Sequence, residues 1–153
     1  MKKILLQLSC FLLFAGGVFG QNLVPNPSFE DYSQCPDAQN QIGYVSSWSN
    51  YGNSISSPDY FNSCSSNFSI PINWGGYQEA SFGEAYMGLY MYETPNPEMA
   101  REYIGAQLTQ PLVKGSEYFV SFKVSLSITT NGGYDFNSAT NKIGALFSTV
   151  PYS

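Results

Sequence analysis

The sequence contains no histidine and few charged residues. Without histidine there is no Ser–His or Cys–His nucleophile pair, no histidine-ligated zinc and no histidine general base. Charged residues make up only 11% of the chain, which excludes a disordered acidic tail and a charge-rich coiled coil. Any acid–base chemistry would therefore have to use carboxylates or tyrosine.

Basic residues are scarce even among the charged ones. The chain has six Lys and Arg against eleven Asp and Glu, which gives a formal net charge of −5. Proteins that bind nucleic acid neutralise phosphates with clustered Lys and Arg. We therefore expect no nucleic-acid partner.

Long hydrophobic runs are also missing, and the single apolar run at the start has the pattern of an export signal. Lys2 and Lys3 precede a mostly apolar stretch over residues 4–14. This stretch is shorter than the roughly 20 residues that a spanning helix needs. We predict a signal peptide at 1–20, a mature domain at 21–153, and export across the inner membrane to a secreted or cell-surface location without a membrane span.

Cysteine is rare, with three in the whole chain. Removal of the leader takes away Cys10 and leaves Cys35 and Cys64, an even number in a compartment that permits disulfides. We predict that these two form a disulfide, and two buried free thiols are the alternative. Two cysteines without CxxC spacing provide too few ligands for a metal site.

Aromatic residues, in contrast, reach 16% of the chain and occur in segments with a two-residue period. In the clearest segment every second side chain is apolar: Tyr118, Val120, Phe122, Val124, Leu126 and Ile128. This pattern predicts a half-buried antiparallel strand with these side chains facing one interior. Shorter alternating segments occur at 85–91, 104–108 and 142–148. Many short strands without helical segments indicate an all-β fold, and we favour a β-sandwich over a barrel.

Residues 31–76 are rich in Ser and Asn and contain several Gly and Pro. These residues favour turns and local hydrogen bonds over regular strands. We predict a long irregular excursion, closed by the cysteine pair, with a short strand near Ile42 to Trp48. Trp48 is expected to fill the core.

The opening Asn22–Glu30 segment, NLVPNPSFE, followed by Trp48, resembles the start of galactose-binding-like jelly rolls, the fold of many carbohydrate-binding modules. Segments 83–89, 103–108 and 112–122 resemble the middle strands of that fold in order. The closer similarity is to secreted surface proteins of gliding Gram-negative bacteria. Three segments here resemble motifs that recur in those proteins: Cys35–Pro36, Pro58–Asn62 and Ile143–Ser148. The resemblance spans 22–150 and implies a jelly-roll β-sandwich.

Such jelly rolls commonly precede an OmpA-like peptidoglycan-binding domain or a type IX sorting domain, and they normally end with a strand that has an acidic pair. Neither of these domains follows Phe147 in this sequence, and no strand with an acidic pair follows it. We therefore expect the jelly roll to be incomplete at its C-terminus. The resemblance also implies a structural calcium held partly by Glu30. The alternative for Glu30 is a strand-end carboxylate bonded to backbone amides, because calcium needs more oxygen ligands than are visible here.

Exposed aromatic rings bind sugars by stacking on the apolar face of a pyranose while nearby polar groups bond its hydroxyls. The candidates for this role are Trp74, Tyr77 and Tyr90, and the alternative is that these rings pack inside the protein. Glu79 and Glu84 are the best candidates for the carboxylate pair of a glycoside hydrolase, although no sequence feature determines the distance between them.

From these residues and the resemblance we predict a non-catalytic binding or adhesion module at the cell surface. A glycan or a cell-envelope polysaccharide is the favoured ligand. The alternative is a structural spacer domain of a larger cell-envelope protein, and a glycoside hydrolase is third.

Overall fold

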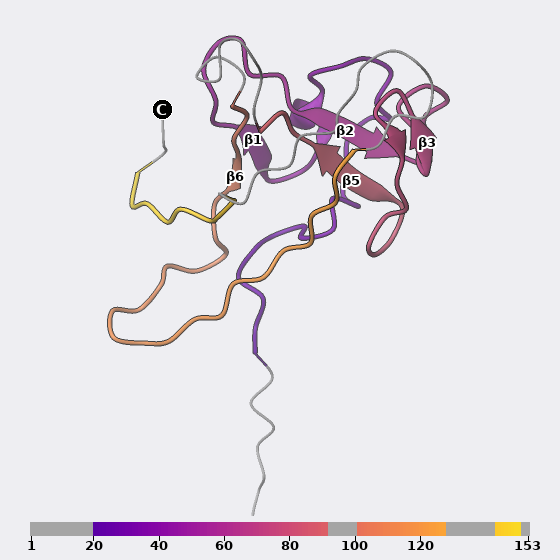
Figure 1. The fold of residues 1–153 in the computed structure, drawn as a ribbon. Coiled ribbons are helices and arrows are strands. Elements are labelled where there is room, and N and C mark those ends of the chain that lie inside the picture. The colour runs from indigo at the N-terminus through magenta and orange to yellow at the C-terminus, as the bar shows by residue number, and fades with distance from the viewer. Residues whose placement is uncertain (1–19, 92–100, 128–142, 151–153) are drawn as a thin grey trace, which may run out of the picture.

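The computed structural model describes residues 20–91, 101–127 and 143–150 (Figure 1). These ranges contain one 3-10 helix and six short strands: η1 (Ile42–Tyr44), β1 (Trp48–Asn50), β2 (Asp59–Asn62), β3 (Ile72–Asn73), β4 (Gly76–Tyr77), β5 (Ala85–Gly88) and β6 (Ile104–Ala106). The described part of the chain is thus rich in strands and poor in helix, as expected from the two-residue periods. None of its helices has the length and apolar character required to cross a membrane.

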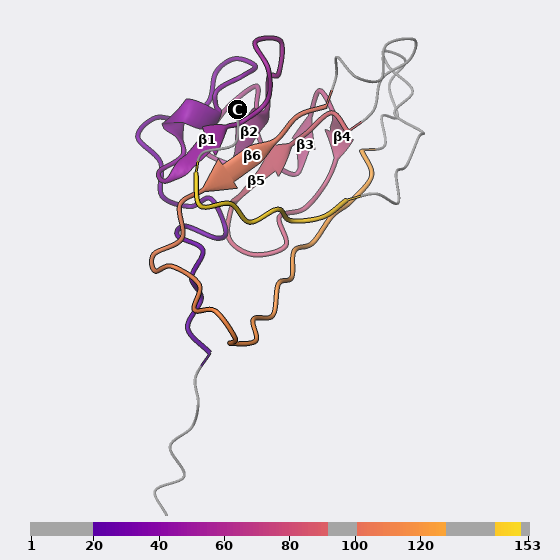
Figure 2. The ribbon, with the colours of Figure 1, turned by 90° about the vertical axis from the view of Figure 1, so that its left-hand side faces the viewer.

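The strands pair as three two-stranded antiparallel sheets (Figure 2). The longest pairing joins β2 to β5, with Asp59 opposite Gly88 and Asn62 opposite Ala85. β1 pairs with the distant β6, and β3 and β4 form a local hairpin. The strands β5 and β6 begin inside two of the segments predicted from alternation, 85–91 and 104–108.

The core lies between β2, β5 and the chain before β1. Its buried members are Val45, Tyr60 and Ala85, against which Phe29, Trp48 and Met87 pack. The indole N–H of Trp48 donates to the Asn26 carbonyl at 2.9 Å, and its ring centroid lies 5.0 Å from that of Phe29. Trp48 is therefore partly buried and packs against the core that it was expected to fill.

Asn26, in the opening motif, joins two neighbouring segments. Its side-chain amide donates to the carbonyls of Asp31 and Ser46, and its side-chain oxygen accepts from the Asp31 N–H. The backbone of Asn26 has a φ of 42°, a left-handed conformation that asparagine tolerates better than most residues. Asn26 thereby connects the opening segment to the chain just before β1.

Cys35 and Cys64 are disulfide-bonded, which confirms the predicted pairing. Their Cα atoms lie 5.8 Å apart, inside the usual range for a disulfide. The hydroxyl of buried Ser65 donates to the Pro36 carbonyl beside the bridge. The disulfide therefore attaches the chain around Cys35 to the residues that follow β2.

The short strand predicted near Ile42 to Trp48 is found only in part, because the chain forms η1 over Ile42–Tyr44 and β1 begins at Trp48. The Val45 N–H donates to the Ile42 carbonyl at 2.9 Å, which closes a tight turn. Ile42 and Val45, three residues apart, are both buried by this turn. Their spacing suits one helical turn better than one face of a strand.

The predicted interior strand at 118–128 is wrong for its described residues. Residues 117–127 form no strand, and the exposed fractions of the alternating apolar side chains run from 42% at Leu126 to 65% at Val124. Residues 143–148 likewise form no strand, and Ile128 and Lys142 lie outside the described residues. Alternation sets the two faces of a strand, but burial also needs a partner strand, and no described segment pairs with 117–127.

Candidate functional site

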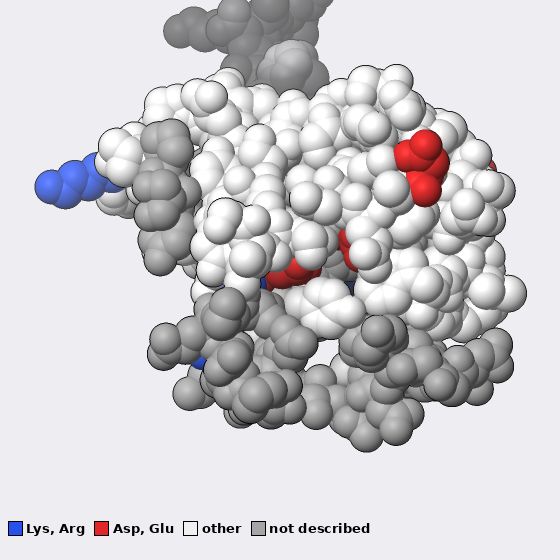
Figure 3. Space-filling model, turned by 90° about the horizontal axis from the view of Figure 1, so that it is seen from above, with Lys and Arg blue, Asp and Glu red and all other residues white. Residues whose placement is uncertain are grey.

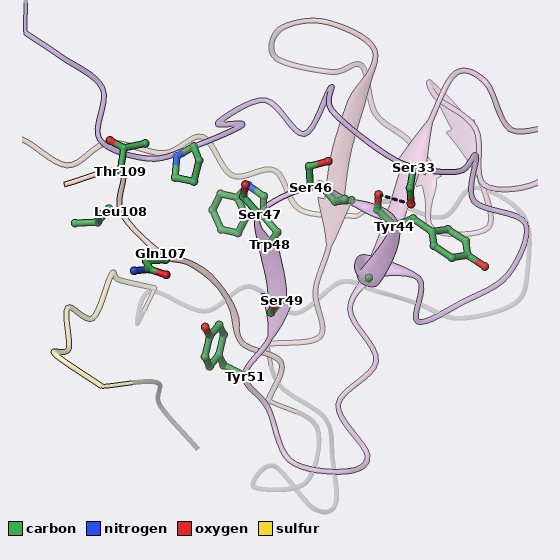
Figure 4. A pocket seen from close by; sticks show the side chains of 13 residues that line it. Ser33, Tyr44, Ser46, Ser47, Trp48, Ser49, Tyr51, Gln107, Leu108 and Thr109 are labelled. Carbon is green, nitrogen blue, oxygen red and sulfur yellow. Dashed lines mark hydrogen bonds between the residues drawn. The ribbon is translucent and has the colours of Figure 1, made fainter. Parts of the chain in front are cut away.

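A groove of about 780 Å³ lies along β1 and the chain that follows β6 (Figure 4). We call it the β1–β6 groove. Three parts of the chain provide most of its lining, residues 43–49, Tyr51 and residues 107–109, together with Pro25 and Ser33.

The β1–β6 pairing builds this groove. Trp48 lies opposite Ala106 and Asn50 opposite Ile104, so residues 107–109 continue beside the chain that enters β1. The Thr109 N–H donates to the Leu23 carbonyl at 2.9 Å, which attaches this continuation to the opening segment. Two segments that are far apart in the sequence therefore form opposite sides of one groove.

The lining of the groove is polar but has no charged side chain. It contains the aromatic residues Tyr44, Trp48 and Tyr51, the amide residue Gln107 and several serines with Thr109. The hydroxyls of the exposed Ser46, Ser47 and Ser49 make no recorded hydrogen bond within the described ranges. These donors and acceptors are therefore free to bond a ligand that carries hydroxyl groups of its own.

Tyr51 is positioned by its neighbours on β6. Its N–H donates to the Tyr103 carbonyl at 2.8 Å, and its ring lies so close to Gly105 that a Cβ at this glycine would come within 2.8 Å of the ring. Because Gly105 has no side chain, the ring of Tyr51 can lie directly on the strand backbone. The ring thus forms a flat wall of the groove next to Gln107 (Figure 4).

The structure brings together two of the three candidate aromatic residues. The rings of Trp74 and Tyr90 are stacked with centroids 6.3 Å apart, and the ring centroid of Phe61 lies 6.2 Å from that of Trp74. Both rings are half-buried in this aromatic cluster, as in the packing alternative. Neither lines the β1–β6 groove.

Tyr77 is exposed on the β3–β4 hairpin, with 59% of its surface accessible. Its hydroxyl donates to the Glu79 carboxylate at 2.6 Å. This hydrogen bond and the negative charge of Glu79 raise the pKa of the Tyr77 hydroxyl. Tyr77 and Glu79 therefore present a ring and a carboxylate to solvent outside the β1–β6 groove.

Glu30 is bonded to backbone, as in its structural alternative. Its Oε1 accepts from the Glu84 N–H at 3.0 Å, and Gly83 has a φ of 68° where a Cβ would overlap the carboxylate. Within the described ranges no three His, Cys, Asp or Glu side chains gather where they could hold a metal ion.

The candidate hydrolase carboxylates bond to different neighbours. Glu84 accepts from the Ser63 hydroxyl, whereas Glu79 accepts from Tyr77. Both are exposed, and neither lines the β1–β6 groove.

Two buried carboxylates, Asp59 and Glu102, were missed from the sequence. Glu102 accepts from the N–H and hydroxyl of Ser57 and from the Tyr90 N–H, and Asp59 accepts from the Asn40 N–H at 2.8 Å. Burial raises the pKa of Asp59 to about 6; the Asn40 hydrogen bond opposes this shift and the charge of Glu102 adds to it. Charged side chains are few on the surface as well: the face drawn in Figure 3 consists mostly of uncharged residues. No sequence signal distinguishes these two acids, because their burial depends on loops that meet only in the fold.

No protein-family model, curated protein or solved structure matches this chain. The chemistry of the β1–β6 groove is therefore the main basis for a functional proposal.

Proposed function

We propose that this chain is an exported, non-catalytic binding module that holds a carbohydrate in the β1–β6 groove. The observation that supports this most directly is the lining: aromatic rings, hydroxyls and an amide, with no charged side chain. A neutral ligand with many hydroxyl groups and a flat apolar face complements such a surface. A pyranose chain has both properties.

In this proposal a sugar ring stacks on Tyr51, whose ring contacts Gly105 through its Cδ2–Cε2 edge. Gln107 and Thr109 bond its hydroxyls from one side of the groove, and the serines at 46, 47 and 49 bond them from the other. The groove volume of about 780 Å³ lies within the usual range of small-molecule sites. A glycan or a cell-envelope polysaccharide is the favoured ligand class.

Export and a jelly-roll sandwich belong to the same proposal. The strand-rich architecture is compatible with such a sandwich, and the Cys35–Cys64 pair is compatible with an oxidising, extracellular compartment. The opening NLVPNPSFE motif and its resemblance to carbohydrate-binding jelly rolls add support from the sequence.

The test is retention of the purified chain on a glycan array and on immobilised cell-envelope polysaccharide, with Tyr51→Ala and Gln107→Ala as groove variants. We expect each variant to weaken binding at least about tenfold, which corresponds to about 1.4 kcal/mol. Tyr77→Ala is the matched control, because Tyr77 is an exposed tyrosine outside the groove. Binding that survives both groove variants, or that Tyr77→Ala abolishes, would remove the groove from the proposal.

A structural spacer domain is the second candidate. The exposed apolar side chains between 118 and 126 favour it, because such a surface is usually covered by another chain. Failure of the chain to bind any glycan would favour this second function.

A further inference from the structure

Residues 117–127, which we call the extended segment, run apart from the strands in both views of the ribbon (Figures 1 and 2). The segment is attached at its two ends. The Val113 N–H donates to the Tyr118 hydroxyl at 2.9 Å, and the Ser127 hydroxyl donates to the Gly75 carbonyl. Between these attachments its backbone forms no ladder with any described strand.

The side chains of this segment are arranged as on a strand. Those at even positions 118–126 are apolar and between 42% and 65% exposed, and the odd positions are mostly polar, with Glu117, Ser121, Lys123 and Ser125 beside the exposed Phe119. An exposed segment with unpaired N–H and C=O groups and one apolar face is a template for pairing with another strand. Pairing would satisfy these groups and bring the apolar side chains of the two strands into contact on one face.

We propose that the partner is the same segment of a second copy, paired antiparallel about Val120. In this register Glu117 lies opposite Lys123 of the second copy, and by symmetry the same charge pair forms a second time. Tyr118 lies opposite Phe122 of the second copy, which gives two aromatic cross-strand pairs. Opposite charges and aromatic pairs stabilise antiparallel strands when they lie directly across from each other.

The charges select this register. If the pairing centres on residue 119, Glu117 lies opposite Ser121, and if it centres on residue 121, Glu117 lies opposite Ser125. A shift that changes the register by one residue would instead place Tyr118 opposite Ser121 and mix the apolar and polar faces. The register centred on Val120 keeps the apolar even positions on one face and pairs all four charges. It forms a two-fold symmetric, closed interface in which each copy contributes the same surface.

The first experiment is sedimentation velocity of the whole chain over a range of concentrations at low salt, where charge effects are least screened. We expect a monomer–dimer equilibrium. Glu117→Lys and Lys123→Glu each create two like-charge pairs, and each should raise the dissociation constant at least about tenfold. An equimolar mixture of the two variants should dimerise again, because one copy of a mixed pair then has a positive charge at both positions and the other copy has a negative charge at both.

A cross-link tests the register itself. Under mild oxidation Val120→Cys should form a disulfide-linked dimer, since residue 120 lies beside its own counterpart across the two-fold axis. Ser125→Cys is the matched control, because the two copies of residue 125 would be about 34 Å apart. It should stay unlinked.

Three results would overturn the proposal. The first is a chain that remains monomeric at every concentration. The second is association that persists in both charge variants, which would indicate another surface or open-ended aggregation. The third is a mixture of the variants that fails to restore the dimer. The β1–β6 groove takes no part in these experiments, so failure here leaves the carbohydrate proposal untouched.

Discussion

At the scale of single residues, the buried carboxyl of Asp59 makes stability depend on pH. Asp59 lies in β2, where burial raises its pKa from 3.8 to about 6, and the nearby carboxylate of Glu102 adds to the shift. A raised pKa means that the folded state holds the proton more tightly than the unfolded chain does. The contribution of Asp59 to stability is therefore greatest below about pH 4 and is lost as the pH rises through about 6.

We expect the Asp59→Asn variant to lose this part of the pH dependence, because asparagine keeps an acceptor for the Asn40 N–H and has no charge to bury. Between about pH 4 and pH 7 the free energy of unfolding of the original chain should fall by about 1 to 2 kcal/mol relative to the variant, after allowance for screening. Urea denaturation of both proteins at each pH measures this difference. Parallel pH profiles would contradict the shift.

At the scale of elements, β2 and the extended segment show that an alternating pattern and burial are separate properties. All four residues of β2 are buried, although the sequence DYFN begins and ends with a polar residue. The extended segment has the better alternation and is exposed. β2 is buried because β5 pairs with it and loops cover it, and neither circumstance is visible in the local sequence.

Two phenylalanines provide a matched comparison of these elements. Phe61 in β2 is 3% exposed and packs against Phe68, Trp74 and Tyr86, whereas Phe122 is 52% exposed. Phe61→Ala should lower the free energy of unfolding by about 3 to 5 kcal/mol, because it leaves a cavity among these rings.

Phe122→Ala should cost less than about 1 kcal/mol when it is measured at low concentration, where the chain is monomeric. Chemical denaturation of both variants is the measurement. An equal loss of unfolding free energy in both variants would indicate that Phe122 is buried and would contradict the exposed course of 117–127.

At the scale of the whole molecule, the regular structure is sparse and long-range connections hold it together. Among the described residues the three sheets have two strands each, and the β1–β6 pairing joins residues that are more than fifty positions apart. The Cys35–Cys64 disulfide closes the most irregular part of the chain onto β2. A covalent link is especially valuable in a domain with so little regular structure.

Removal of this disulfide by the Cys35→Ser/Cys64→Ser double substitution should lower the free energy of unfolding by about 2 to 4 kcal/mol, because the unfolded chain gains conformational entropy. Denaturation curves recorded with and without reductant measure the effect. Reductant should destabilise the original chain and leave the double variant unchanged. A reductant effect of the same size on both proteins would place the sensitivity elsewhere.

The sequence by itself determined the features that depend on composition, on the two-residue period and on the even number of cysteines. These are a strand-rich chain, the pairing of two cysteines, and the packing of Trp48 against the core. It also predicted a carbohydrate ligand at Trp74, Tyr77 and Tyr90, which no observation tests, whereas the groove proposed from the structure is lined by Tyr51 and Gln107. Only the tertiary structure decided which alternating segments found a partner and where a groove formed. The physical reason is that burial and grooves arise from contacts between distant segments, as when β6 brings Gln107 beside β1. Local periodicity gives the faces of a strand but contains no information on what will cover them.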